Sequence, residues 1–205
     1  MDLVRFFLGL HAATHAPDVD AGRTSGSERW LGGLSDDQMR LRPGEGVNSI
    51  VWLLWHMART EDVAVNLVVA GRAQVFDDGW ARRMNVARHD MGTGMTADEV
   101  AELSERADVA AVRAYRSAVG IRTREVVQSL PLEAWDEILG LEDTTRAAVT
   151  GAFGPNDEWI DGVGHRPWQG HARGHQLGQT AIRHNTAHIG EGVTIRGLAG
   201  LGLGI

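Results

Sequence analysis

The chain has 205 residues, of which 43% are hydrophobic and 23% are charged, and its formal net charge is −7. This composition predicts one folded domain spanning residues 1–205, because the apolar content can fill a core and the length suits a single domain. The acidic balance argues against a nucleic-acid partner and against an electropositive membrane-binding surface. Cysteine is absent, which excludes disulfides, thiolate metal ligands and a cysteine nucleophile.

The N-terminus and the apolar runs of the chain bear on its location. Residues 1–5 carry an acid where a secretory signal carries positive charge, and no small-residue cleavage site follows. No stretch reaches the roughly 18 uninterrupted apolar residues of a membrane span. We therefore expect a cytoplasmic protein with no membrane partner and with a small molecule as its substrate.

The first half of the chain predicts helices at three places. Helical spacing of apolar residues predicts a helix over about residues 2–16, and a polar loop follows over 17–27. Ser35, with Gln38 three residues later, has the pattern of a capping box and predicts a short helix. Residues 48–70 are apolar on almost every side of a predicted helix. Such a helix normally lies buried at the centre of a bundle.

The middle of the chain alternates irregular and helical patterns. Residues 72–94 are rich in Gly, Asp and Arg and predict a long irregular connection. Thr96 and Glu99 form a second capping-box pattern, which begins a long amphipathic helix predicted to run to about Leu130. Residues 135–179 show no sustained periodicity.

The C-terminal part predicts a last helix over about residues 180–198, followed by a Gly- and Leu-rich tail from about residue 198. Since no alternating strand pattern occurs, the elements predict an all-α fold: a four-helix bundle with long irregular connections. If the tail does not fold back, its apolar side chains are exposed and can be buried against a second copy. We therefore expect a homodimer.

Two histidines on the predicted last helix have the spacing of a metal site. His184 and His188 are four residues apart, so both imidazoles project from one face of the helix, and Glu191 lies on the same stripe. Zinc peptidases place Glu directly after the first His, whereas this chain has Asn185 there, which argues against a peptidase. The same spacing is also typical of two polar residues on a half-exposed helix.

A third ligand must come from another segment, and His56 is the best candidate. It lies in the middle of the most apolar predicted helix, where an imidazole without a partner is costly. The alternative is a core histidine hydrogen-bonded to a carbonyl. Three histidines from two helices leave a coordination position open for water or substrate.

The other histidines fit this site less well. Three of them are expected to be surface or packing residues, although the first two share one face of the first predicted helix: His11, His15 and His89. His171 and His175 repeat the four-residue spacing, with His165 nearby. Glycines interrupt this stretch, so we expect a loop overhanging the site rather than a regular helix with ligands.

Four sequence segments together resemble the DinB-like superfamily. They are residues 48–62 (NSIVWLLWHMARTED), 79–81 (GWA), 92–94 (GTG) and 184–191 (HNTAHIGE). The superfamily includes bacillithiol- and mycothiol-dependent S-transferases and the N-terminal domain of mycothiol-dependent maleylpyruvate isomerases. The likeness covers roughly residues 1–198, in element order as well as in motif.

The resemblance implies a four-helix bundle that holds a divalent metal, zinc or nickel, through three histidines. Matched residue by residue, these are His56, His184 and His188. It also suggests a metal-dependent S-transferase that acts on small electrophiles and, since Cys is absent, uses a low-molecular-weight thiol such as mycothiol. Glu191 would orient a ligand or relay a proton, or else be a solvated carboxylate. The alternatives are a non-catalytic metal-binding stress-response protein and a metal-free structural bundle.

Overall fold

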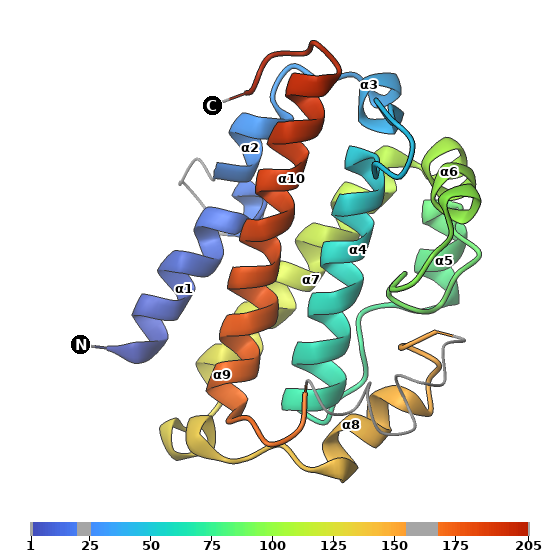
Figure 1. Ribbon diagram of the computed structural model, residues 1–205. Coiled ribbons are helices and arrows are strands. Elements are labelled where there is room, and N and C mark those ends of the chain that lie inside the picture. Colours follow the sequence, from blue (N-terminus) through green and yellow to red (C-terminus); the bar gives the residue numbers. More distant parts are fainter. Residues whose placement is uncertain (1, 20–25, 155–167, 205) are drawn as a thin grey trace.

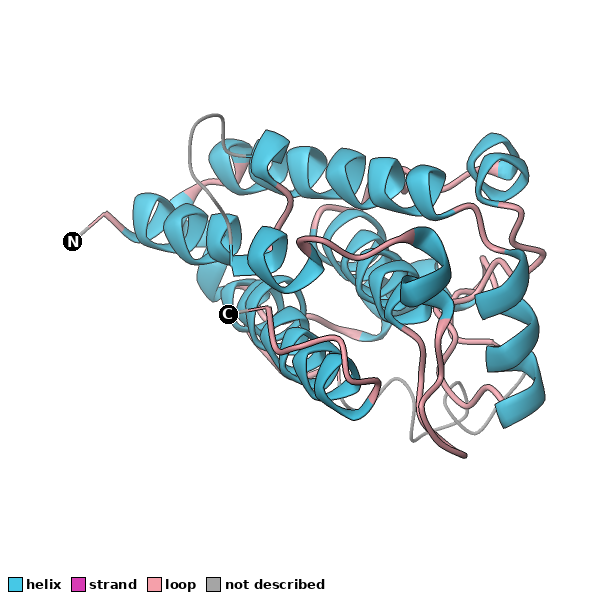
Figure 2. Ribbon diagram, turned by 90° about the horizontal axis from the view of Figure 1, so that it is seen from above, coloured by secondary structure: helices cyan, strands magenta, loops and turns pink. Residues whose placement is uncertain are grey.

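The computed structural model describes residues 2–19, 26–154 and 168–204, and within them it contains helices and loops but no strand (Figures 1 and 2). The all-α prediction is confirmed. Four long helical elements pack side by side as a bundle (Figure 1). They are α1 (Leu3–Thr14), α4 (Ile50–Asp62) continued by the π-helical segment η2 (Val63–Val69), α7 (Val109–Ser129), and α9 (Arg173–Leu177) continued by the π-helical segment η5 (Gly178–His184) and by α10 (Asn185–Leu198).

Shorter helices cover the ends and one side of this bundle. They are η1 (Pro17–Val19), α2 (Gly26–Leu31), α3 (Asp36–Arg40), α5 (Asp78–Met84), α6 (Ala97–Arg106), η3 (Leu132–Asp136) and α8 (Leu141–Ala148). Both predicted capping boxes form, with Ser35 paired to Gln38 and Thr96 paired to Glu99. Each box satisfies two backbone donors that a helix N-terminus otherwise leaves open.

The central helix is α4, as its apolar composition predicts. Every residue of α4 and of η2 is buried, and α7 and α10 pack along α4. Large side chains such as Trp30 and Trp55 are completely inaccessible to solvent. At Gly192 of α10, a Cβ would lie 2.3 Å from the Trp30 ring, so glycine allows α10 to approach α2 closely. None of the described helices is long and apolar enough to cross a membrane.

The π-helical segments η2 and η5 contact each other in the middle of the bundle. A π turn closes its hydrogen bond one residue further along the chain than an α turn does, and such turns are frequent at functional sites. The extra residue rotates everything that follows it about the helix axis. The direction in which His184 points therefore does not follow from extending the helical wheel of α9.

Two predicted boundaries in the middle of the chain are wrong. The expected long helix from Thr96 is divided into α6 and α7, because the Asp108 side chain accepts a hydrogen bond from the Ala111 amide (2.8 Å) and begins a new helix. The connection over residues 72–94 contains α5, which Asp77 caps through the Trp80 amide (2.8 Å). In both places an aspartate cap begins a helix that the pattern of the wider segment did not predict.

The last helix begins at Arg173, earlier than predicted. Glycines in residues 170–178 suggested an irregular loop, but Gly174 lies inside α9. A Cβ at Gly174 would lie 2.8 Å from the Trp135 ring, so this glycine permits close packing between α9 and η3. The expectation of a loop around His175 is therefore wrong.

The C-terminal tail folds back rather than remaining free. The Arg196 guanidinium donates hydrogen bonds to the carbonyls of Leu201 (3.1 Å) and Gly202 (2.9 Å), and also to that of Trp30 (2.6 Å). Leu198 and Leu203 nevertheless remain 64% and 50% exposed. The condition on which the homodimer was expected, a tail that does not fold back, is therefore not met, and the homodimer stays a prediction.

Candidate metal centre

Three histidines from distant parts of the chain converge between α4 and α10. The His184 Nε2 atom lies 3.2 Å from the His56 Nε2 atom and 3.2 Å from the His188 Nε2 atom. One ring nitrogen from each residue lies within 4.8 Å of those of the other two. The three side chains that the sequence singled out are thus brought together, and we call them the histidine triad.

The ring orientation of two triad members is set by hydrogen bonds on their far nitrogens. The His56 Nδ1 atom lies 2.5 Å from the carbonyl oxygen of Met91, which can only accept, so Nδ1 carries the proton. The His188 Nδ1 atom lies 2.8 Å from the Glu191 carboxylate, which likewise accepts. In the neutral rings, Nε2 is therefore left with a lone pair directed into the triad.

These lone pairs fit a cation. His184 Nε2 can satisfy at most one of these two lone pairs with a proton of its own, whereas a cation among the three nitrogens satisfies both at once. Zinc bound tetrahedrally at 2.0–2.1 Å places its nitrogen ligands about 3.3 Å apart, close to the 3.2 Å separations of the triad. The residues present therefore suit a divalent metal with imidazole ligands.

The electrostatic environment keeps two members of the triad neutral and the neighbouring carboxylate charged. Burial lowers the pKa of His56 to about 4 and that of His184 to about 3, so both rings are uncharged at neutral pH, as metal ligands must be. The hydrogen bond from His188 lowers the pKa of Glu191, which also accepts a hydrogen bond from Asn48 (2.8 Å). Glu191 is thus an oriented anion behind a ligand.

One wall of the triad is aromatic. The Trp52 ring stacks on His56, with 4.7 Å between ring centroids and 14° between planes. Its indole nitrogen donates to the Met95 sulfur at 3.2 Å, which ties the segment before α6 to α4. The His188 side chain remains 20% exposed and that of Glu191 34%, so the site is reached from solvent on their side.

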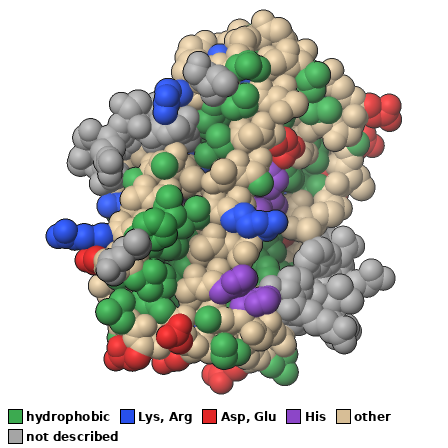
Figure 3. Space-filling view, turned by 60° about the vertical axis from the view of Figure 1, so that its left-hand side comes forward, with side chains coloured by type: hydrophobic (Ala, Val, Ile, Leu, Met, Phe, Trp, Pro, Cys, Tyr) green, Lys and Arg blue, Asp and Glu red, His purple; other side chains and the backbone are tan. Residues whose placement is uncertain are grey.

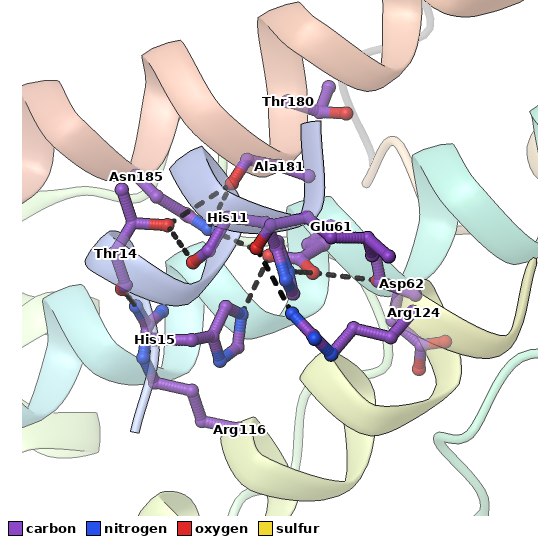
Figure 4. A network of polar contacts seen from close by, with 12 residues as sticks. His11, Thr14, His15, Glu61, Asp62, Arg116, Arg124, Thr180, Ala181 and Asn185 are labelled. Carbon is purple, nitrogen blue, oxygen red and sulfur yellow. Dashed lines mark hydrogen bonds and ion pairs between the residues drawn. The ribbon is translucent and has the colours of Figure 1, made fainter. Parts of the chain in front are cut away.

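A second cluster contains histidines that were expected to lie on the surface or to serve as packing. The His11 Nε2 atom lies 2.9 Å from Glu61 Oε1 and the His15 Nε2 atom lies 3.0 Å from Glu61 Oε2. All three residues are completely buried, and Figure 4 shows them pointing toward one another from α1 and α4. The surface interpretation of His11 and His15 is therefore wrong. We call these residues the glutamate cluster.

Sequence reasoning missed Glu61, although two signals pointed to it. A carboxylate in a helix that is apolar on every side needs buried partners. His11 and His15, four residues apart on the first helix, supply such partners on one face. Only the packing of α1 against the rest of the bundle shows that these two signals belong together.

The remaining histidines join neither group within the described residues. His171 and His175 stack on each other with 4.5 Å between ring centroids. His89 is exposed and packs edge-on against Phe76. His165 lies outside the residues that the structure describes.

The sequence profile of the DinB superfamily matches residues 23–191, and the chain belongs to this superfamily. The matched region contains the whole histidine triad. No protein of curated function matches the sequence. The chain is also similar in structure to a conserved protein from Enterococcus faecalis, with a TM-score of 0.66, 17% sequence identity and 97% of each chain covered. At this identity the similarity shows the fold.

Proposed function

We propose that this DinB-superfamily protein binds one divalent metal ion, zinc or nickel, through the Nε2 atoms of His56, His184 and His188. The observation that carries the proposal is the inward direction of the His56 and His188 lone pairs, set by Met91 and Glu191. Three imidazole ligands leave room at the ion for a further ligand, which is the arrangement of catalytic rather than structural zinc sites.

We further propose a metal-dependent thiol S-transferase that acts on small electrophiles. The bound metal would supply a Lewis acid that lowers the pKa of a thiol or water. Because the chain has no Cys, the sulfur nucleophile must arrive on a low-molecular-weight thiol. The resemblance to mycothiol-dependent members of the superfamily supports a thiol of that type.

Glu191 has two tasks in this proposal. It accepts the hydrogen bond from His188 Nδ1 and thereby holds that ring with Nε2 toward the other two histidines. Its carboxylate is also partly exposed, so it can accept a proton from an incoming thiol. Asn48 donates to the other carboxylate oxygen and fixes its position.

Metal analysis of protein prepared without a histidine tag tests the site. We expect about one metal ion per chain, and its absence at saturating zinc and nickel would leave a metal-free structural bundle. Incubation of the loaded protein with a low-molecular-weight thiol and monochlorobimane then tests turnover. Metal-dependent conjugation supports the transferase, and bound metal without conjugation by any such thiol supports a non-catalytic metal-binding protein.

The homodimer is also retained as a proposal. Exposed apolar side chains gather near the N-terminus on the face shown in Figure 3, and in α1 they are Leu3, Phe6 and Leu10. Light scattering coupled to size exclusion, on the full chain and on one ending at Gly197, tests whether the tail takes part. A monomer mass for both chains would contradict the dimer.

A further inference from the structure

Glu61 lies at the centre of the glutamate cluster with every acceptor position used. Oε1 accepts hydrogen bonds from His11 (2.9 Å) and Thr123 (2.6 Å). Oε2 accepts from His15 (3.0 Å) and Asn185 (2.7 Å). The donors come from α1 and the residue that follows it, from α7 and from α10, and they converge on a carboxylate that solvent does not reach.

This carboxylate is an anion. Four donors leave no lone pair for a proton of its own. Burial acts to raise the pKa of Glu61, but His15 and His11 together hold it well below its usual value. Burial lowers the pKa of His15 to about 4, so that donor is neutral at neutral pH. The negative charge of Glu61 is therefore stabilised by hydrogen bonds and remains available to act on its surroundings.

The glutamate cluster is linked to the histidine triad along two segments of the chain. Glu61 follows His56 by five residues on α4, and Asn185, which binds Glu61 Oε2, directly follows His184. Asn185 is completely buried and also donates to the Ala181 carbonyl at 3.1 Å. The position of Asn185, and with it the backbone that carries His184, is thus tied to the carboxylate.

One buried cation opposes Glu61. Arg116 of α7 is 2% exposed and donates to the Thr14 carbonyl at 2.5 Å. Burial lowers the pKa of the Arg116 guanidinium to about 10, and the charge of Glu61 acts in the opposite direction and raises it. Arg116 is therefore a positive charge within the field of Glu61, and the two charges partly offset each other.

We propose that Glu61 is a buried counter-charge for the cation held by the histidine triad, and that it positions His184 through Asn185. The inference rests on the proposed metal site. Three neutral imidazoles bring no negative charge to a divalent ion. In a poorly polarisable interior, a carboxylate that is hydrogen-bonded to the residue after a ligand stabilises such an ion far more than it would in water.

The hydrogen bonds of the glutamate cluster argue against a second metal site there. Its ligand atoms also lie within 4.8 Å of one another. However, Nε2 of both histidines faces the carboxylate, and His11 Nδ1 has no partner among the described residues. The Nε2 proton of His11 is therefore the one that binds Glu61, and a metal there would have to displace it and break the network.

Two substitutions of opposite expected sign test the counter-charge. The dissociation constants of zinc and nickel are measured by competition with a chromophoric chelator for the wild type, Glu61→Gln and Arg116→Met. Removing the negative charge is expected to weaken metal binding about 10-fold to 100-fold, and removing the opposing positive charge to strengthen it several-fold. Because the groups are buried, both shifts should persist between low and high salt.

A purely structural role would move the two affinities in the same direction or not at all. Thr123→Val is the matched control, because it removes one hydrogen bond to Glu61 and keeps the charge. Unchanged affinity in Glu61→Gln, or weaker binding in Arg116→Met, would overturn the inference. If Glu61→Gln does not fold, the sign of the Arg116→Met shift decides. Failure of the wild type to bind either metal would instead overturn the proposed metal site itself.

Discussion

The histidine triad and the glutamate cluster use the same residue type in opposite ways. Each contains two histidines four residues apart, His184 with His188 along one continuous helix and His11 with His15 at the end of α1. In the triad, hydrogen bonds hold Nδ1 of His56 and His188, and Nε2 faces a shared space. In the glutamate cluster, Nε2 itself binds the carboxylate. The four-residue spacing therefore brings imidazoles together in both places, while the hydrogen-bond partner of each ring nitrogen decides what the imidazoles can bind.

The position of the carboxylate differs in the same way. Glu191 lies behind the His188 ring, where it leaves Nε2 available and makes the ring a better ligand. Glu61 instead binds the Nε2 atoms of both rings in its cluster, so neither Nε2 is available to a metal. We therefore expect the histidines of the triad to act as metal ligands and the histidines of the glutamate cluster to act mainly on stability, and the following substitutions separate these effects.

Replacing a triad histidine should have the largest effect. His184→Ala removes one of three ligands, so we expect the metal affinity to fall at least about 100-fold and the protein to be isolated without metal. Elemental analysis of tag-free protein measures this. His175→Ala is the matched control from the neighbouring helix α9. Full metal content in His184→Ala, or loss of metal in His175→Ala, would contradict the assignment.

Acid should destabilise the metal-free protein, and His15 of the glutamate cluster contributes to this together with His56 and His184, whose pKa values burial also lowers. The pKa of His15 is about 4 in the folded chain and 6.5 in the unfolded chain, so unfolding takes up a proton in this range. The stabilising contribution is complete above pH 6.5 and is lost as the pH falls to 4, by about 3 kcal/mol for this group. Urea unfolding at pH 7.5, 5.5 and 4.5, with chelator present, measures it.

The same experiment on His15→Asn isolates the contribution of this residue. The free energy of unfolding of that variant should depend less on pH than that of the wild type. Equal pH dependence in the two proteins would show that His15 does not titrate as the structure implies.

Removing a donor of the glutamate cluster should cost stability without removing metal. His11→Ala leaves Glu61 Oε1 with one donor fewer and creates a cavity, so we expect a loss of about 2–3 kcal/mol in the free energy of unfolding. The exposed His89, changed to Ala, should alter stability by less than about 0.5 kcal/mol. Metal content near that of the wild type in His11→Ala would show that His11 is not needed for metal binding. Complete loss of metal would contradict this prediction.

Glu191→Gln should have the smallest effect. The amide keeps its shape beside His188 but loses the negative charge, and we expect the dissociation constant of the metal to rise about 10-fold, or about 1.4 kcal/mol. Chelator competition measures this change. An unchanged dissociation constant would make Glu191 a solvated carboxylate with no part in the site.

Much of the fold follows from short-range patterns. The buried helix around His56, the capping boxes at Ser35 and Thr96, and the shared face of His184 and His188 all depend on residues within one or two turns. Such relations are local, so periodicity and capping chemistry predict them. The interruption at Asp108 shows the limit, since its cap competed with a continuous amphipathic pattern.

The amino-acid sequence was enough to predict a helical bundle in which His56 of one helix can approach His184 and His188 of another. The packing of distant segments sets which nitrogen of His56 faces the triad, because Met91 holds its Nδ1, and which nitrogen of His11 binds Glu61. It also decided the rotation introduced by the π-helical segments and the folding back of the tail onto Arg196. A hydrogen bond between distant segments depends on how the helices pack, and the spacing of residues within one helix does not determine that packing.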